Sequence, residues 1–153
     1  MISGRRVNHL HDRPVAGGRA IQNRERRGRF LVSFVDYADS RDELSKAAQV
    51  LMMEAGNDGV FVCGIVGGEV HVSARSNEPA VALGGLLKEA FGGIGSAGGH
   101  NSAAGAQVPL AALDLPSGES PKLLASAVEE KVWSLLLGAA RRIQPGRGKG
   151  AAP

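Results

Sequence analysis

The alternation of apolar and polar residues divides most of the chain into short segments of two kinds. Runs of β-branched, aromatic and other apolar residues, or strict alternation, predict strands at residues 29–37, 59–68, 68–76 and 104–110. Gly67 and Gly68 separate the second run from the third, and this pair predicts a hairpin. In the third run, apolar Val70, Val72 and Ala74 alternate with polar Glu69, His71, Ser73 and Arg75. That strand therefore has one apolar side and one polar side.

Three further segments carry apolar residues at spacings of three and four, which predict helices at residues 39–56, 79–92 and 120–143. Ser40 and Glu43 have the spacing of a capping box, Gly56 is expected to end this helix, Pro79 suits a first helical turn, and Ser120 is a candidate cap. Strands and helices alternate along the chain. The order predicts an α/β domain with a small mixed β-sheet flanked by helices.

Charge separates the two ends from the body of the chain. Residues 1–29 carry eight arginines and two acidic residues, and residues 141–153 carry three arginines, one lysine and no acid. Because the whole chain of 153 residues has a net charge of only +3, the body is acidic. We predict a basic N-terminal arm at residues 1–27, one domain at residues 28–143 and a basic tail at residues 144–153, with both termini disordered. An acidic body argues against a broad nucleic-acid-binding face and favours a local contact.

Other features of the composition point to an ordinary globular domain. The apolar runs are shorter than the roughly 20 residues of a membrane-spanning helix, and the N-terminus lacks the apolar core of a secretory signal. We expect no membrane partner and a cytoplasmic location. Cys63, the single cysteine, lies in an apolar run and is predicted to be a buried structural thiol.

Residues 92–106, GGIGSAGGHNSAAGA, place one imidazole, His100, among residues with almost no side chains. Glycines allow a backbone to approach a ligand closely, and consecutive amides can bind an anion. The glycines follow a helix and precede a strand, which is the reverse of the dinucleotide fingerprint, and no P-loop motif is present. From composition alone, a flexible linker and an anion-binding loop both stay open.

Two motifs occurring in order resemble one family. SARS at 73–76, AFGGIGSAGGH at 90–100 and NSAAG at 101–105 resemble the pattern S-x-R-S, helix, F-G-G-G-G-H-x-x-A-A-G of the DHHA1 domain. This is the C-terminal substrate-binding domain of DHH-family phosphoesterases, which include RecJ-like exonucleases and nanoRNase/pAp phosphatases. Four additional residues, 94–97, separate FGG from GGH, and this longer form resembles the archaeal-type branch in which a TrkA-N module precedes the DHH and DHHA1 domains. The resemblance covers about residues 28–112.

The resemblance implies a site for a nucleotide or a short single-stranded nucleic acid. In relatives, the arginine of S-x-R-S and the glycine-rich loop face the metal centre of the DHH domain across a cleft. Arg75 is then expected to pair with a phosphate, and His100 to contact a phosphate or a base. The implied substrate-binding residues are Ser73, Arg75, Ser76, Gly98, Gly99, His100, Ala104 and Gly105.

The metal-binding half of this chemistry is missing from the sequence. DHH domains hold two metals, usually manganese, on aspartates and a D-H-H motif, and this chain has no D-H-H. The nearest candidate is His9, His11 and Asp12, and the arginines around this group would repel a cation. We therefore expect no catalytic residue, metal ligand or cofactor in this chain, with manganese only in a partner DHH domain.

Three hypotheses follow from the sequence. The chain is a nucleotide-binding DHHA1 module that does not hydrolyse its ligand, or it forms part of an active manganese-dependent phosphoesterase when a DHH-bearing chain supplies the metals. Alternatively, it is a non-catalytic protein-interaction module in which helix 120–143 pairs with a partner. A homodimer is compatible with each of the three.

The isolated chain is predicted not to hydrolyse oligonucleotides, pAp or model phosphodiesters, because it lacks an aspartate cluster that could hold two metals. Phosphate release with added manganese, measured for the wild-type chain and for His11→Ala, checks this. Manganese-dependent turnover that disappears in His11→Ala would contradict it.

Overall fold

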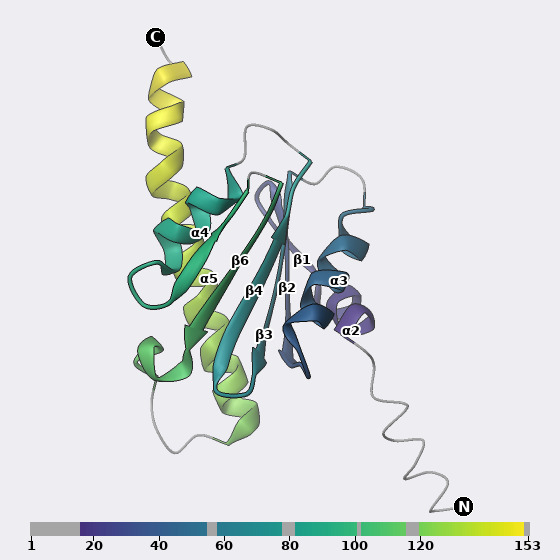
Figure 1. The fold of residues 1–153 in the computed structure, drawn as a ribbon. Helices are drawn as coiled ribbons and strands as arrows, with labels where there is room; N and C mark the ends of the chain where they lie inside the picture. Colours follow the sequence, from purple (N-terminus) through teal and green to yellow (C-terminus); the bar gives the residue numbers. More distant parts are fainter. Residues whose placement is uncertain (1–15, 55–57, 78–81, 101, 116–119, 152–153) are drawn as a thin grey trace, which may run out of the picture.

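The computed structural model describes residues 16–54, 58–77, 82–100, 102–115 and 120–151, which form one six-stranded sheet with helices on both sides (Figure 1). The strand order across the sheet is β1-β2-β3-β4-β6-β5. The strands are β1 (Glu25–Arg27), β2 (Phe30–Tyr37), β3 (Gly59–Val66), β4 (Glu69–Arg75), β5 (Ser96–Gly99) and β6 (Ala103–Pro109). The helices are α2 (Ala16–Asn23), α3 (Arg41–Leu51), α4 (Leu83–Phe91), the short 3₁₀ helix η1 (Leu110–Leu113) and α5 (Pro121–Ala151).

The sheet is mixed, as the order of the predicted elements indicated. Strands β2 and β3 are parallel and α3 connects them, whereas every other neighbouring pair is antiparallel. The predicted hairpin between β3 and β4 is confirmed, and Gly67 at its turn has a φ of 63°, a left-handed value that glycine adopts more readily than other residues. This hairpin places the polar side of β4 next to α3.

Two apolar cores lie on the two faces of the sheet. On one face, alternate side chains of β2, β3, β4 and β6 pack against α4, η1 and α5, with Phe61, Phe91 and Leu136 almost completely buried. On the other face, β2 and β3 pack against α2 and α3 through residues such as Leu44, Leu51 and Val62. β3 is buried on both faces, which explains its nearly continuous apolar run.

The predicted helix starts are confirmed where the structure describes them. The Ser40 side chain accepts a hydrogen bond from the backbone N–H of Glu43, and Ser120 Oγ accepts one from the N–H of Leu123. Each bond satisfies an amide that the first helical turn leaves without an intrahelical partner. The other two boundary residues, Gly56 and Pro79, lie outside the described residues, and the boundaries predicted there are wrong: α3 already ends at Leu51 and α4 begins only at Leu83.

The N-terminal segment departs from the prediction of a disordered basic arm, because residues 16–27 form α2 and β1 against the sheet. Arg19 Nη1 donates to the Val35 carbonyl at 2.7 Å, Asn23 Nδ2 donates to the Phe34 carbonyl at 2.8 Å, and Ala20 is completely buried. These contacts are mostly made by polar side chains on backbone atoms of β2. A composition rich in arginine does not reveal them, since the same residues are common in solvated tails.

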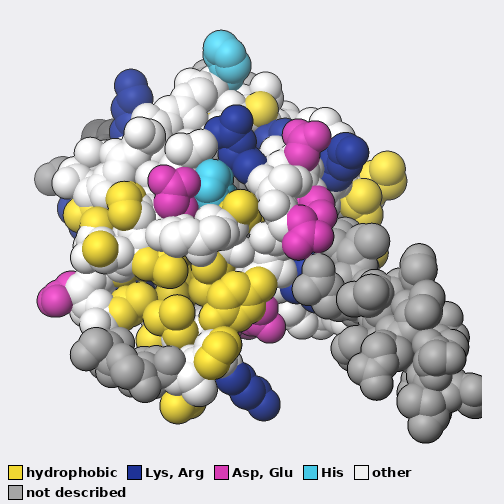
Figure 2. All heavy atoms as spheres, turned by 60° about the horizontal axis from the view of Figure 1, so that its bottom comes forward, with side chains coloured by type: hydrophobic (Ala, Val, Ile, Leu, Met, Phe, Trp, Pro, Cys, Tyr) yellow, Lys and Arg dark blue, Asp and Glu magenta, His cyan; other side chains and the backbone are white. Residues whose placement is uncertain are grey.

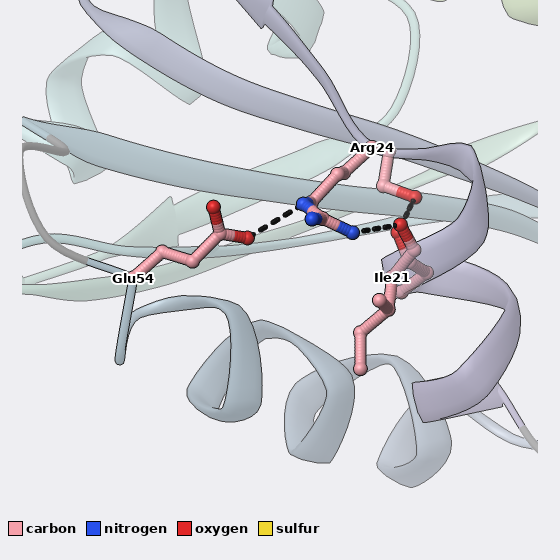
Figure 3. A network of polar contacts seen from close by, with 5 residues as sticks. Ile21, Arg24 and Glu54 are labelled. Atoms are coloured by element: carbon pink, nitrogen blue, oxygen red, sulfur yellow. Dashed lines mark hydrogen bonds and ion pairs between the residues drawn. The ribbon is translucent and has the colours of Figure 1, made fainter.

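An ion pair fastens the link between α2 and β1 to the segment that follows α3 (Figure 3). Arg24 Nε lies 2.7 Å from Glu54 Oε1, and the same guanidinium donates to the Ile21 carbonyl. Both side chains are partly exposed, so the contact contributes little stability by itself. It does orient the end of α2 relative to the end of α3.

The C-terminal helix is longer than the predicted helix 120–143. α5 runs to Ala151 and so enters the stretch from residue 144 that we predicted to be a disordered tail, and its last turns extend beyond the sheet (Figure 1). No helix among the described residues is long and apolar enough to cross a membrane.

The glycine-rich segment also differs from the predicted loop, since its middle forms the edge strand β5 in a hairpin with β6. This hairpin lies very close to α4: the N–H of Gly84 donates to the His100 carbonyl at 3.1 Å. A Cβ at Gly84 would lie 2.5 Å from the carbonyl oxygen of Gly99. The glycines therefore permit a close approach between α4 and the end of the hairpin.

Replacing Ser33 with alanine is expected to lower the free energy of unfolding by about 1–2 kcal/mol. Ser33 is buried and its hydroxyl donates to the Ala20 carbonyl at 2.8 Å, so the change leaves a buried acceptor without its donor. Urea unfolding measures the effect, with Ser134→Ala on the exposed side of α5 as the control. Equal stability of the two variants would contradict the docking of α2 on the sheet.

The adjacent glycines Gly84 and Gly85 of α4 test the close approach between this helix and the β5–β6 hairpin. Gly84→Ala is expected to destabilise the fold by about 1–3 kcal/mol, because the new Cβ has no room against Gly99. Gly85→Ala is expected to be neutral or to stabilise by up to about 1 kcal/mol, because a Cβ at Gly85 meets nothing within 4 Å and alanine favours the helix. Thermal unfolding of both variants measures the difference, and an unchanged or raised melting temperature for Gly84→Ala would refute the close approach.

Candidate functional site

Among the described elements, no helix covers β6 and β5 on the side of the sheet where α2 and α3 lie. On this side α3 covers β3 and β4, whereas β6 and the edge strand β5 lie beyond it (Figure 1). The alternation along β6 shows the consequence: Ala104, Ala106 and Val108 are buried toward α4 and α5, whereas Gly105 and Gln107 on the other side are partly exposed. The polar side of β4 and the small residues of β5 and β6 thus form a shelf beside α3.

Two hollows lie on this shelf, and together we call them the α3 groove. The first, of about 330 Å³, is lined by Gln49, Met52, Arg75, Ser76, Asn77, Ser102 and Ala103. The second, of about 350 Å³, is lined by Arg41, Ser96, Ala97, Gly98, Gly105, Ala106 and Gln107. The hollows adjoin, because Ala103 of the first and Gly105 of the second lie two residues apart on the same side of β6.

Arg75 lies at the end of β4 in the first hollow. Its Nη1 donates to the carbonyl of Ala74 at 2.8 Å and contacts Ser73 Oγ at 3.4 Å. Both acceptors are neutral, and among the described residues no carboxylate lies within ion-pair distance of this guanidinium. Arg75 is therefore held in place, and no carboxylate among the described residues neutralises its charge.

The two serines that flank Arg75 in the SARS motif are buried and hold the strand end. Ser73 Oγ lies 3.1 Å from the hydroxyl of Ser45 on α3. Ser76 donates through its hydroxyl to the carbonyl of Asp58, and through its backbone N–H to the carbonyl of Ser102 at 3.0 Å. Their visible contacts are thus with α3 and with the segments beside β4, which is a positioning arrangement around Arg75.

His100 lies at the end of the β5–β6 hairpin and its side chain is exposed. Its backbone N–H donates to the carbonyl of Ala103 at 2.7 Å, and Ala103 is the residue that pairs with Arg75 across β4 and β6. Arg75 and His100 are 25 positions apart in the sequence, and this pairing brings them to the same end of the strands. The His100 imidazole lines neither hollow of the α3 groove.

The other residues implied by the family pattern divide between the groove and the core. Gly98 and Gly105 pair with each other and both line the second hollow. Gly99, with a φ of 140°, follows at the end of β5, and Ala104 opposite it is buried toward α4. Ala104 therefore lies outside the groove, on the apolar side of β6.

Sequence reasoning missed several residues that line the groove. Among them, Arg41 and Gln107 have the side chains best suited to bind a polar ligand. Arg41 is the first residue of a helix, where an exposed arginine is usually a solvated side chain. Gln107 alternates with Gly105 on the exposed side of β6, and this alternation was the available signal. Their proximity depends on where α3 crosses the sheet, which no local pattern reports.

Two titratable side chains of the sheet are buried, one on each face. Cys63 is fully buried, as predicted, and desolvation together with the nearby Glu129 carboxylate raises the pKa of its thiol far above the usual range, so it is unreactive. His71, on the polar side of β4, lies with Nε2 3.1 Å from Glu69 Oε1. Its buried Nδ1 has no hydrogen-bond partner among the described residues.

The residues present do not provide a metal centre in the part of the chain that the structure describes. No three histidine, cysteine, aspartate or glutamate side chains gather there in a way that could hold a metal ion. The group His9, His11 and Asp12 lies outside the described residues.

Comparison with known proteins finds a relative that matches most of this chain. Over 121 residues the chain is 36% identical to the uncharacterized protein MJ1633 of Methanocaldococcus jannaschii, a match that covers 77% of this chain and 24% of that protein. The chain thus spans about a quarter of the length of this relative.

Two solved structures match the chain at low sequence identity. An exopolyphosphatase-related protein from Bacteroides fragilis matches with a TM-score of 0.50 and 11% identity, over 82% of this chain and 35% of that one. The C-Ala domain of Aquifex aeolicus alanyl-tRNA synthetase matches with a TM-score of 0.47 and 19% identity, over 71% of this chain and 96% of that one.

The family comparison agrees with the motifs and the fold. The model of the DHHA1 domain matches residues 27–132, which include the whole sheet except most of β1, together with α3, α4 and the first part of α5. Within this range lie the SARS motif, the glycine-rich hairpin and the groove between them. The chain belongs to the DHHA1 domain family and resembles the DHHA1 domains of DHH-family phosphoesterases.

Proposed function

We propose that the α3 groove binds the phosphate groups of a nucleotide or a short single-stranded nucleic acid, with Arg75 as the principal anion contact. The observation that carries this proposal is the state of Arg75. Its guanidinium lies in a hollow, is oriented by two neutral oxygen atoms and has no carboxylate partner among the described residues. By contrast, Arg24, Arg27, Arg29 and Arg142 each lie within 4.0 Å of an acidic side chain.

The surroundings of Arg75 suit a phosphate better than a simple cation or an apolar ligand. Asn77 and Ser102 line the same hollow and offer neutral hydrogen-bonding groups beside the guanidinium. A guanidinium binds two oxygens of one phosphate at once, and a charge-assisted hydrogen bond is about twice as strong as a neutral one. His100, at the same end of the strands, is proposed to contact a phosphate or a base when the ligand extends past the hairpin.

The proposal gives this chain the substrate-holding part of a two-part site. DHHA1 domains usually belong to proteins with a DHH domain, and we propose that a DHH domain, in the same protein or in a partner, faces the α3 groove. Manganese in that domain would activate water for phosphodiester hydrolysis. The role of this chain is to bind and orient the phosphates, and the complete assembly would be an oligoribonuclease, a pAp phosphatase or a RecJ-like exonuclease.

The structure gives less support to the alternative that the chain is a protein-interaction module. That hypothesis used the apolar face of the helix at 120–143 as the contact for a partner. In α5 this face, with Val128, Val132 and Leu136, is buried against the sheet of the same domain. The groove, in contrast, is open and contains a guanidinium in each hollow, and this favours the nucleotide hypothesis.

Arg75→Ala is expected to weaken binding of a 5′-phosphorylated oligonucleotide or pAp by about 10- to 100-fold, because it removes a charge-assisted contact worth about 1.5–3 kcal/mol. Arg75→Lys should restore binding only in part, since lysine does not form the bidentate contact. His100→Ala should weaken binding by a smaller factor. Isothermal titration measures the dissociation constants, and thermal unfolding checks that each variant folds.

Arg141→Ala serves as the control for charge, because Arg141 is an exposed arginine on α5, on the opposite side of the sheet. The dissociation constant of this variant should stay within about twofold of the wild-type value. A charge far from the groove acts on the ligand only through a long-range interaction, which salt screens. If the wild-type chain binds neither ligand, or if Arg75→Ala binds as well as Arg141→Ala, the α3 groove is not the binding site.

A further inference from the structure

We propose that the second hollow of the α3 groove, at Arg41, is a separate anion subsite, so that the groove binds two phosphates of one short single strand. This inference rests on the proposed function, since it assigns a second contact to the same ligand. The residues that would form the subsite are Arg41 of α3, Gln107 of β6 and the paired glycines Gly98 and Gly105.

Arg41 supplies the cationic side chain of this hollow. Within the described part of the chain this side chain makes no hydrogen bond and no ion pair. Its helix neighbours Asp42 and Glu43 carry the opposite charge, and neither lies within 4.0 Å of its guanidinium. Arg41 therefore has both a cavity beside it and an unused charge, which is the combination also found at Arg75.

The floor of the hollow favours an anion with oxygen atoms. Gln107 and Ser96 face each other across β5 and β6, line the hollow and offer neutral donors. Gly98 and Gly105 have no side chains to shield their backbone, so a ligand can approach the strands closely. A Cβ at Gly98 would also lie 3.4 Å from Cε of Lys88, which places the stem of a second cationic side chain beside the edge strand.

The acidic groups on this face do not neutralise the subsite. Glu69 lies on the same side of β4, and its carboxylate contacts His71 at 3.1 Å. His71 pairs with Gln107 across β4 and β6, so Glu69 and His71 lie at the border of the hollow rather than among the residues that line it. The groups that line the hollow are one guanidinium and neutral residues.

The spacing of the two arginines defines the ligand. α3 runs along the groove from Arg41 in the second hollow to Gln49 in the first, a rise of about 12 Å. One phosphate cannot contact both hollows, whereas a short strand with several phosphates can extend from Arg75 to Arg41. The inferred ligand is thus a phosphorylated oligonucleotide, and a nucleoside monophosphate would occupy only the first hollow.

The test compares two ligands on matched variants. Isothermal titrations use a 5′-phosphorylated trinucleotide and a 5′-nucleoside monophosphate, with the wild-type chain, Arg41→Ala, Arg75→Ala and the control Arg141→Ala. Arg41→Ala is expected to weaken trinucleotide binding by about 5- to 20-fold and to change monophosphate binding by less than about twofold. Arg75→Ala should weaken binding of both ligands. The slope of log K against log salt for the trinucleotide should fall by about one in Arg41→Ala.

Each other outcome counts against a stated part of the account. If Arg41→Ala binds the trinucleotide as Arg141→Ala does while Arg75→Ala is impaired, the second subsite is refuted and the proposed function stands. If Arg41→Ala weakens both ligands equally, Arg41 does not form a separate subsite. If the wild-type chain binds neither ligand, the proposed function fails and the subsite fails with it.

Discussion

The arrangement of the groove depends on the partial cover that α3 gives to one side of the sheet. Leu44, Ala48 and Leu51 bury α3 on β2 and β3, and its flank reaches β4, where Ser45 contacts Ser73. β6 and β5 continue the sheet beyond the helix, so α3 becomes a wall and the two strands become a floor. Any change that moved α3 one strand further would close the groove and bury the partly exposed side of β6.

The small residues of the hairpin have two roles that follow from this arrangement. On the side of α4, Gly84 and Gly99 allow the helix and the hairpin end to approach closely, which fixes the backbone of His100 through its carbonyl. On the side of α3, Gly98 and Gly105 leave part of the floor of the groove without side chains. The glycine-rich segment is therefore an ordered strand pair rather than a flexible linker.

Much of the fold could be predicted from the sequence because its signals are local. Periodicity located α3, α4 and α5, and side-chain alternation identified the two sides of β4. The contacts of α2 and the strand β5 could not be predicted this way. α2 is held largely by hydrogen bonds from Arg19 and Asn23 to β2, and β5 consists of small residues with no strand propensity, ordered by pairing with β6.

The candidate site, like the fold, could be predicted from the sequence only in part. The resemblance to the DHHA1 pattern brought Arg75 and the glycines into view, because these residues form motifs of fixed spacing. Arg41 and Gln107 belong to no motif and enter the groove only because α3 and β6 meet there. The serines of the SARS motif are buried, and the structure shows them bonded to α3 and to neighbouring segments, where they hold Arg75.

The most direct measurement of the central claim is a map of ligand-induced shifts in the backbone amide NMR signals. A 5′-phosphorylated trinucleotide is titrated into the isotope-labelled chain at low salt. The account predicts the largest shifts at Arg75, Ser102, Gly98 and Gly105, with little change along α5 on the opposite side of the sheet. Shifts confined to α5 or to the basic N-terminal residues, with the groove unchanged, would contradict it.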